Sequence, residues 1–176
     1  MKSLRLSIVT VFLINALLLS SCFSSRKVSS KKNSYDYKEY SHKLGIPLKG
    51  NENPKLIAEI SRWMGTPYMN GGCTTDGTDC SCLVCNLYRT VYGISLERSS
   101  DAMAKKNCKK IIPSDLKEGD LVFFSSKGSK VSHVGLYLHD GYFVHATTSK
   151  GVMVNNLNEP YYQKYFTMGG RVIQKS

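Results

Sequence analysis

The apolar residues in the middle of the chain recur at helical spacing in two segments. The first segment follows Asn53, a helix-capping residue with a proline after it, and should end at Gly65. The second segment begins at Cys80 and should end near Gly93. A loop rich in asparagine, glycine and threonine, residues 68–78, separates the two predicted helices. Their expected buried faces consist of Leu56, Ile57, Ile60 and Trp63 in the first helix and of Leu83, Val84, Leu87 and Val91 in the second.

The last third of the chain changes to short runs that are rich in β-branched and aromatic residues. Asp140-Gly141 separates two of these runs and is a strong hairpin signal, because the tight turn needs positive φ. The expected strands are residues 121–124, 132–138, 142–146, 152–155 and 165–173, after a helical turn around residues 100–105. Helices followed by an antiparallel meander predict one α+β domain.

The N-terminal residues have the pattern of an export signal. Two basic residues precede an apolar run from Ile8 to Leu19. This run is shorter than the roughly 20 residues of a membrane-spanning helix and is typical of a secretory signal peptide. Leu19-Ser20-Ser21-Cys22 then resembles the lipobox of bacterial lipoproteins. That resemblance implies that residues 1–21 are removed and that Cys22 is acylated; an ordinary signal peptide with a chance cysteine is the alternative.

The charge of the chain is concentrated after this signal. The whole chain has 24 Lys and Arg against 13 Asp and Glu, a net charge of +11, and loss of two basic residues with the signal leaves +9. Much of the excess lies in residues 26–32, a Ser/Lys stretch without apolar periodicity that we interpret as a linker. Residues 22–50 therefore form a lipidated cysteine, a basic linker and an arm, in which residues 37–48 should dock on the domain. The remaining positive charge either favours binding to an anionic wall polymer or only keeps the protein soluble. We expect no nucleic-acid partner.

The candidate chemistry begins at Cys80. A thiol at a helix N-terminus beside an imidazole has a lowered pKa, as a nucleophile requires. Of the four histidines, His42 lies in the arm and His139 beside the hairpin turn, where we expect solvated side chains. His133 and His145 flank the same hairpin, so His145 could hydrogen-bond one ring nitrogen of His133 and leave the other facing the thiol.

Five short blocks of sequence follow one another along residues 54–173. They are Gly65-Thr66-Pro67-Tyr68 with Gly71-Gly72, Asp79-Cys80-Ser81, Gly119-Asp120-Leu121-Val122-Phe123-Phe124, His133-Val134-Gly135-Leu136-Tyr137 and Phe143-Val144-His145-Ala146. In order and spacing these blocks closely resemble the NlpC/P60 cell-wall peptidases, and five ordered blocks are far more specific than one motif. The resemblance implies a papain-like fold, with N-terminal helices packed on an antiparallel β-sheet, in a peptidase domain of residues 51–176.

The same resemblance implies a cysteine peptidase that cleaves peptidoglycan stem peptides, most often between D-glutamate and a diamino acid such as diaminopimelate. By position, Cys80 would be the nucleophile, His133 the general base and acid, and His145 the orienting residue. Tyr68 would lie beside the thiol and assist the oxyanion. Asp79 and Ser81 would line the pocket that binds the amino end of the stem peptide, with Ser132 near it. An amidase or acyltransferase on the same fold and a non-catalytic wall-binding lipoprotein are the alternatives.

Two positions depart from the family pattern. The family usually has glycine where this chain has Cys82 and glutamine where it has Met103. A side chain at position 82 adds volume behind the nucleophile and could narrow the cleft or bring a second thiol near it.

We expect a monomer that is anchored to a membrane through Cys22, at the periplasmic face of the outer membrane.

The other cysteines suggest structural roles. Cys73, Cys80, Cys82 and Cys85 form a cluster that lacks the two Cys-x₂₋₄-Cys pairs of a closed zinc site, so we expect no metal and no cofactor. Cys85 should be a core residue. A disulfide between Cys73 and Cys108 is possible in an exported protein, but sequence alone leaves the pairing open.

Overall fold

The computed structural model describes residues 36–126 and 130–173, so the predicted signal peptide, Cys22 and the basic linker lie outside the described residues. Within the described part of the chain, none of the helices has the length and apolar character needed to cross a bilayer. The helices are α2 (Tyr37–Leu44), α3 (Pro54–Trp63), α4 (Cys80–Tyr92), α5 (Ser100–Ala102) and α6 (Pro160–Tyr165), with a π-helical turn (Met103–Asn107) and a 3₁₀ turn (Pro113–Asp115). The strands are β1 (Cys73–Thr74), β2 (Gly77–Thr78), β3 (Cys108–Ile111), β4 (Leu121–Phe124), β5 (His133–Tyr137), β6 (Tyr142–Thr147), β7 (Gly151–Asn156) and β8 (Phe166–Val172).

Local capping signals set the ends of α3 and α4, and both predicted helices are confirmed. The Asn53 side chain accepts hydrogen bonds from the first backbone N–H groups of α3, and Pro54 occupies the first turn. Asp79 caps α4 in the same way by accepting from the N–H of Cys82. Helix α4 ends at Gly93, whose φ of +68° places it in the left-handed region that glycine tolerates. Cys80 is consequently fixed as the first residue of α4.

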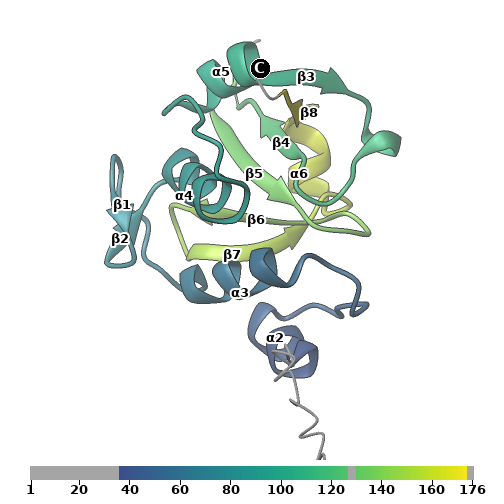
Figure 1. Cartoon of the computed structure of the whole chain (residues 1–176). Helices are drawn as coiled ribbons and strands as arrows, with labels where there is room; N and C mark the ends of the chain where they lie inside the picture. The colour runs from purple at the N-terminus through teal and green to yellow at the C-terminus, as the bar shows by residue number, and fades with distance from the viewer. Residues whose placement is uncertain (1–35, 127–129, 174–176) are drawn as a thin grey trace, which may run out of the picture. The chain divides into compact units, whose positions relative to one another are not determined.

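Six strands form an antiparallel sheet in the order β3-β8-β4-β5-β6-β7 (Figure 1). The predicted meander is confirmed for β4 to β7, and the β5–β6 turn has positive φ at Asp140 and Gly141 as expected. The expectation that the last strand continues the meander is wrong, because β8 pairs with β4 on the side away from β5 and lies between β4 and β3. Strand β3 was not predicted; it is an edge strand whose two lysines are exposed, so it lacks a clear apolar pattern.

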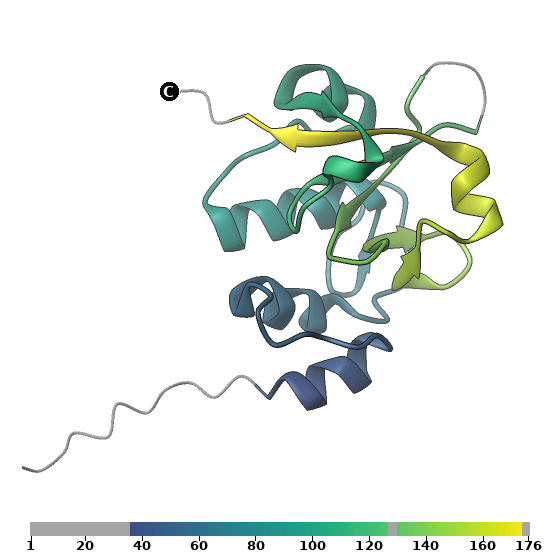
Figure 2. The ribbon, with the colours of Figure 1, turned by 90° about the vertical axis from the view of Figure 1, so that its right-hand side faces the viewer.

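Helix α6 was also missed by the sequence pattern. Its six residues include three tyrosines, which have modest helix propensity, and its start is marked only by Pro160 in the first turn. Helix α6 lies against the face of the sheet opposite α4 (Figure 2), and there Tyr162 packs on Val122, Phe124 and Phe143. The short helix therefore covers a second, smaller core.

The main core lies between the other face of the sheet and the stacked helices α4, α3 and α2. Helix α4 packs directly on β5 and β6, α3 packs on α4, and α2 packs on α3 (Figures 1 and 2). The predicted faces of α3 and α4 supply this core, although Val91 is only half-buried. Met103, at the position where the family usually has glutamine, is fully buried in the same core. The buried side chains of this core therefore pack α4 against the β5–β6 hairpin.

The segment before α3 packs on the domain through apolar and charged side chains. Leu44 and Ile46 are buried in the main core. His139 is half-buried rather than solvated as expected, with its Nε2 atom 3.4 Å from Oε1 of the buried Glu52 and its Nδ1 atom 3.2 Å from Asp140. His139 thus joins this segment to the β5–β6 turn, away from Cys80.

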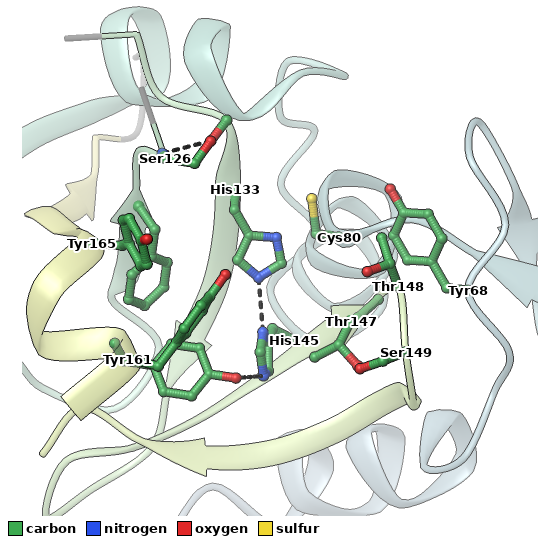
Figure 3. Close-up of a pocket in the computed structure, with 14 residues that line it drawn as sticks. Tyr68, Cys80, Ser126, His133, His145, Thr147, Thr148, Ser149, Tyr161 and Tyr165 are labelled. Carbon is green, nitrogen blue, oxygen red and sulfur yellow. Dashed lines mark hydrogen bonds between the residues drawn. The ribbon is translucent and has the colours of Figure 1, made fainter. Parts of the chain in front are cut away.

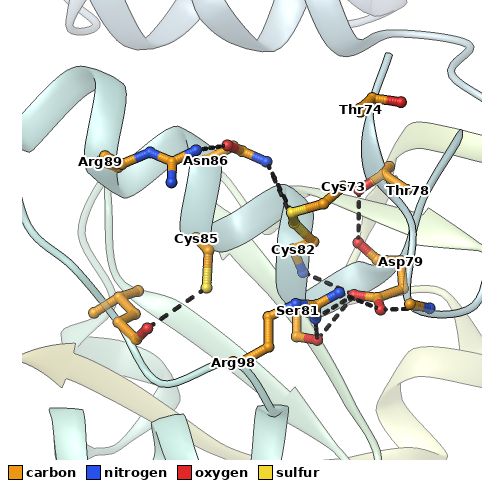
Figure 4. The surroundings of a disulfide bond; sticks show 12 residues. Cys73, Thr74, Thr78, Asp79, Ser81, Cys82, Cys85, Asn86, Arg89 and Arg98 are labelled. Carbon is orange, nitrogen blue, oxygen red and sulfur yellow. Dashed lines mark hydrogen bonds and ion pairs between the residues drawn. A yellow bond between two sulfur atoms is a disulfide. The ribbon is translucent and has the colours of Figure 1, made fainter. Parts of the chain in front are cut away.

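The loop before α4 contains the short β1–β2 hairpin and is tied to α4 by a disulfide between Cys73 and Cys82 (Figure 4). The two Cα atoms are 5.4 Å apart. The sequence left open whether Cys73 pairs with Cys108; in the structure it does not, and Cys108 is a free cysteine of β3. The Cys82 side chain is fully buried and points to the hairpin, so it brings no second thiol to Cys80.

Gly151 holds the same loop from its other side. It has a φ of +69°, and a Cβ atom there would lie 2.1 Å from the carbonyl oxygen of Thr66. This close approach allows Val152 N–H to donate to Thr66 and Gly65 N–H to donate to the carbonyl of Val152, both at 2.9 Å. The loop that carries Tyr68 is consequently fixed to β7 as well as to α4.

We predict that removal of the Cys73–Cys82 disulfide destabilises the domain without unfolding it. The bond spans a sequence separation of 9 residues, and closing a loop of about that length contributes roughly 2–3 kcal/mol by restricting the unfolded chain. The Cys73→Ser/Cys82→Ser protein should lose about this free energy of unfolding in urea titration. Dithiothreitol should lower wild-type stability to the same level and leave the double variant unchanged; a wild type that does not respond to reductant contradicts the prediction.

Candidate active site

Cys80 opens into a cavity of about 340 Å³ that is lined by the N-terminus of α4, by residues of β4, β5 and β6, by the turn that follows β6, and by α6 (Figure 3). Its thiol lies at the N-terminus of α4, and the residue is only 8% exposed. We call this space the Cys80 cavity; it is lined by Tyr68, Cys80, Phe124, Ser126, Ser132, His133, His145, Ala146, Thr147, Thr148, Ser149, Tyr161, Tyr162 and Tyr165. The structure therefore brings together five of the seven residues that the sequence singled out for chemistry or binding.

The protonation of Cys80 differs from the expectation of a lowered pKa. Burial raises the pKa of the thiol above its ordinary value. The backbone N–H groups of Val134, Ser81 and Cys80 itself act in the opposite direction, but burial outweighs them. In the free protein Cys80 is consequently held as a neutral thiol, and its ionisation requires a neighbouring base.

His133 is the base within reach of this thiol. It comes from the first residue of β5, and Figure 3 shows one of its ring nitrogens directed toward the Cys80 sulfur. Its other nitrogen, Nε2, lies 2.7 Å from Nδ1 of His145, so the hydrogen bond predicted across the hairpin is present. Burial, together with the neighbouring His145, lowers the pKa of His133 to about 3. A neutral imidazole that can accept the thiol proton therefore faces Cys80 at neutral pH.

His145 is the most deeply buried polar residue of the site, with 1% of its surface exposed. Its ring packs edge-on against Tyr162 and close to Phe143. The Nε2 atom lies 2.9 Å from Oδ1 of Asn155 and 3.3 Å from the Tyr162 hydroxyl. Burial lowers the pKa of His145 to about 4, against the opposing hydrogen bond to Asn155. Both histidines are thus neutral in the folded protein.

Tyr68 lies across the Cys80 cavity from His133, so that the thiol is between the two side chains in Figure 3. Burial raises the pKa of the Tyr68 phenol, with smaller contributions from Cys80 and Asp79. The hydroxyl consequently keeps its proton and can donate a hydrogen bond. Ser132, which precedes β5, is exposed at the rim of the same cavity.

Asp79 and Ser81 do not line the Cys80 cavity, which differs from the pocket positions implied by the family resemblance. Both are buried and bound by Arg98, a residue that the sequence analysis did not single out (Figure 4). The Asp79 carboxylate accepts from Nη1 and Nη2 of Arg98 at 2.9 and 2.7 Å, and Ser81 Oγ donates to Asp79 at 2.9 Å. Burial acts to raise the pKa of Asp79, but these hydrogen bonds together lower it. Asp79 therefore fixes the N-terminus of α4, while Arg98 neutralises its charge behind the thiol.

Aromatic residues of α6 form the wall of the cavity opposite Tyr68, and the sequence analysis gave them no individual roles. Tyr161 is 64% exposed and its ring centroid lies 4.9 Å from that of Tyr165. Phe124 also lines the cavity, and its ring centroid lies 5.8 Å from that of His133. The helix itself was not predicted, so no pattern placed these tyrosines at the site.

The described residues contain no group of three or more His, Cys, Asp or Glu side chains placed to hold a metal ion. The chemistry that the described site can support without further groups is proton transfer between a thiol and an imidazole, with nucleophilic attack by sulfur on a bound carbonyl. Hydrogen-bond donors beside the sulfur can stabilise the negative charge that forms on the carbonyl oxygen.

The buried neutral histidines predict a specific pH dependence of stability. Histidine in an unfolded chain has a pKa of about 6.5, whereas the folded pKa of His145 is about 4. Between these values the unfolded state binds the additional proton, so acidification favours unfolding by up to about 1.4 kcal/mol per pH unit for one such group. The His145→Gln protein should therefore lose stability less steeply than the wild type between pH 6.5 and pH 4.

The exposed His42 on α2 provides the matched control. Urea titrations at several pH values should give the His42→Gln protein the same slope as the wild type. If His145→Gln has the wild-type slope as well, His145 is not held neutral by the fold.

Comparison with known proteins agrees with this geometry. The NlpC/P60 family model matches residues 65–171. The chain is 38% identical over 122 residues to "Murein DD-endopeptidase MepS/Murein LD-carboxypeptidase" of Escherichia coli K12, covering 69% of this chain and 64% of that protein. It is 39% identical over 118 residues to "Probable endopeptidase NlpC" of the same organism, covering 66% of this chain and 76% of the relative.

A solved structure gives the same result for the fold. A protein described as similar to a lipoprotein of the NLP/P60 family, from Staphylococcus aureus, has a TM-score of 0.61 and 27% identity to this chain. The similarity covers 74% of this chain and 47% of the Staphylococcus protein. The expected fold, an α+β domain with helices packed on an antiparallel sheet, is confirmed, and the chain belongs to the NlpC/P60 family.

Proposed function

We propose that this protein is a peptidoglycan endopeptidase in which Cys80, His133 and His145 carry out the reaction. The observation that supports this most directly is the arrangement in the Cys80 cavity, where a thiol at a helix N-terminus faces a buried, hydrogen-bonded pair of histidines. The names of the relatives MepS and NlpC, a murein endopeptidase and a probable endopeptidase, support the substrate class.

The reaction follows from the protonation states of these groups. His133 accepts the proton of Cys80 as the sulfur attacks the carbonyl carbon of the peptide bond. The carbonyl oxygen becomes an oxyanion, and in this proposal the N–H groups of Cys80 and Ser81 and the Tyr68 hydroxyl donate hydrogen bonds to it; their position beside the thiol supports this role. Protonated His133 then gives its proton to the departing amine, and water hydrolyses the thioester.

The proposed bond is the one implied by the family resemblance, between D-glutamate and a diamino acid such as diaminopimelate. The name of MepS gives a different bond for that relative, since a DD-endopeptidase cleaves between two D-centres of the cross-link. The two possibilities give different products: the first leaves a dipeptide on the glycan, and the second converts cross-linked dimers to monomers.

We further propose that the protein acts at a membrane to which Cys22 is lipid-anchored, at the periplasmic face of the outer membrane. The lipobox-like residues and the basic linker that follow the apolar run support this placement. Dual acylation gives stable anchoring, where a single chain does not. The linker would let the domain reach the wall while it stays tethered.

We predict that the purified domain cleaves isolated muropeptides and that Cys80→Ala reduces the rate at least about 1,000-fold, because the nucleophile is removed. Mass spectra of the digest identify the bond by the product masses. Cys85→Ala is the matched control, since Cys85 is a free cysteine of the same helix outside the Cys80 cavity.

Cleavage that survives Cys80→Ala contradicts the mechanism. Release of the whole stem peptide from the glycan identifies an amidase, and transfer of the acyl group to an acceptor other than water identifies an acyltransferase. Binding of muropeptides without any product contradicts the peptidase and favours a non-catalytic wall-binding protein.

The anchoring is tested separately in cells. The full-length protein should incorporate a labelled fatty acid and sediment with membranes, and Cys22→Ala should abolish both. A Cys22→Ala protein that is labelled as strongly as the wild type excludes lipidation at this residue.

A further inference from the structure

Asn155 lies on β7, the strand that pairs with the His145 strand β6. Among the described residues, it is the only residue of β7 that hydrogen-bonds to His133 or His145. Its Oδ1 atom lies 2.9 Å from Nε2 of His145. An amide oxygen has no proton to give, so in this hydrogen bond Nε2 of His145 must be the donor. The neighbouring residue of β7 on this face, Met153, pairs with His145 in the strand register and offers no such acceptor oxygen.

The orientation of the Asn155 amide is fixed by Glu159. The Nδ2 atom of Asn155 lies 3.0 Å from both carboxylate oxygens of Glu159. An ionised carboxylate only accepts hydrogen bonds, so it must face the NH₂ group of the amide and the oxygen must face His145. Glu159 is itself held in place, because the backbone N–H of Asn156 donates to it at 2.7 Å.

The Tyr162 hydroxyl gives the Asn155 oxygen a second contact. It donates to Oδ1 of Asn155 at 3.1 Å and lies 3.3 Å from Nε2 of His145. Tyr162 is buried, and its ring packs edge-on against that of His145. Rotation of the amide would therefore break hydrogen bonds to two different residues of the α6 segment.

These hydrogen bonds determine where the protons of both histidines lie. Because Nε2 of the neutral His145 carries its proton, Nδ1 of His145 is an acceptor. Nε2 of His133, 2.7 Å away, must then be the donor. The remaining nitrogen of His133, Nδ1, is left without a proton, and this is the nitrogen directed toward Cys80 (Figure 3).

We propose that Asn155 is a positioning residue of the peptidase, which selects the tautomers of His145 and His133 so that the unprotonated nitrogen of His133 faces the Cys80 thiol. The wrong tautomer would present an N–H group to the thiol and could not accept its proton. The proposal rests on the proposed function for its kinetic consequences, but the tautomers themselves are properties of the folded protein. Glu159 and Tyr162 act through Asn155 by holding its amide.

Two substitutions of Asn155 separate hydrogen bonding from packing. Asn155→Leu keeps a similar volume and removes the acceptor, and it should lower kcat roughly 10- to 100-fold with little change in KM, as for other groups that orient a reactive imidazole. Asn155→Asp restores an acceptor oxygen for His145 but loses the donor to Glu159, so it should recover part of the activity relative to the leucine variant.

The aspartate variant should also move the pH profile. The titratable groups that face His145 are His133 from β5 and Glu159 and Tyr162 from the α6 segment. A new carboxylate beside Nε2 stabilises the protonated pair, so the acidic limb of kcat/KM should shift to higher pH. Asn158→Asp places the same charge at an exposed position of the adjacent turn, without a hydrogen bond to His145, and should leave the profile unchanged.

Nitrogen-15 NMR of the histidine rings tests the inference without any turnover. In the Cys80→Ala protein at pH 7, His145 should carry its proton on Nε2, and Asn155→Leu in that background should produce a mixture of tautomers. An Asn155→Leu protein that is folded, keeps wild-type kcat and pH profile, and retains the Nε2-protonated form of His145 overturns the proposal. If the wild type cleaves no peptidoglycan while the tautomers respond to Asn155 as stated, the proposed function fails and this inference stands.

Discussion

The N-terminus of α4 packs against the β5–β6 hairpin, and the rest of the site depends on this contact. Cys80 and His133 are far apart in the sequence: α4 supplies the thiol and the β5–β6 hairpin supplies the histidine pair, so neither element alone contains both the nucleophile and its base. The main core fills the space between α4 and the sheet, so the position of the thiol relative to the imidazole is set by close packing. The loop before α4 adds to this constraint through the Cys73–Cys82 disulfide and the close approach at Gly151.

Burial then decides the electrostatics of the site. The same low-dielectric surroundings that raise the pKa of Cys80 lower those of His133 and His145, so the resting site is a chain of neutral groups. Charged side chains lie beyond these groups on two sides. Glu159 binds the Asn155 amide on the far side of His145, and Arg98 neutralises the Asp79 carboxylate behind the thiol. Because each hydrogen bond in this row of neutral groups has a fixed donor, one proton can pass from the Cys80 sulfur to His133 while the buried polar atoms keep their partners.

Local signals in the sequence predicted the parts of this site that short-range rules control. Caps and glycines marked α3 and α4, and the Asp140-Gly141 turn pairs the two strands that carry His133 and His145. Features that depend on residues distant in sequence were not predictable in the same way. The edge strand β3, the tyrosine-rich α6 and the pairing of Cys73 with Cys82 have no local pattern that requires them.

The polar support of the site was missed for the same reason. Arg98 and Asn155 look like ordinary surface residues in the sequence, and only the fold brings them to Asp79 and His145. The resulting burial of Cys80 also reversed the expected direction of its pKa, since a helix N-terminus predicts a more acidic thiol when burial is not known.

The central claim is that the Cys80 sulfur attacks the substrate carbonyl after passing its proton to His133. The most direct test is rapid acid quenching of the enzyme during turnover of a purified muropeptide, followed by mass spectrometry of the protein. The account predicts an acyl adduct on the peptide that contains Cys80, and its loss in the His133→Ala protein. The account is contradicted if the wild-type enzyme turns over the muropeptide but no acyl adduct is found at early quench times. It is also contradicted if the adduct is on a residue other than Cys80.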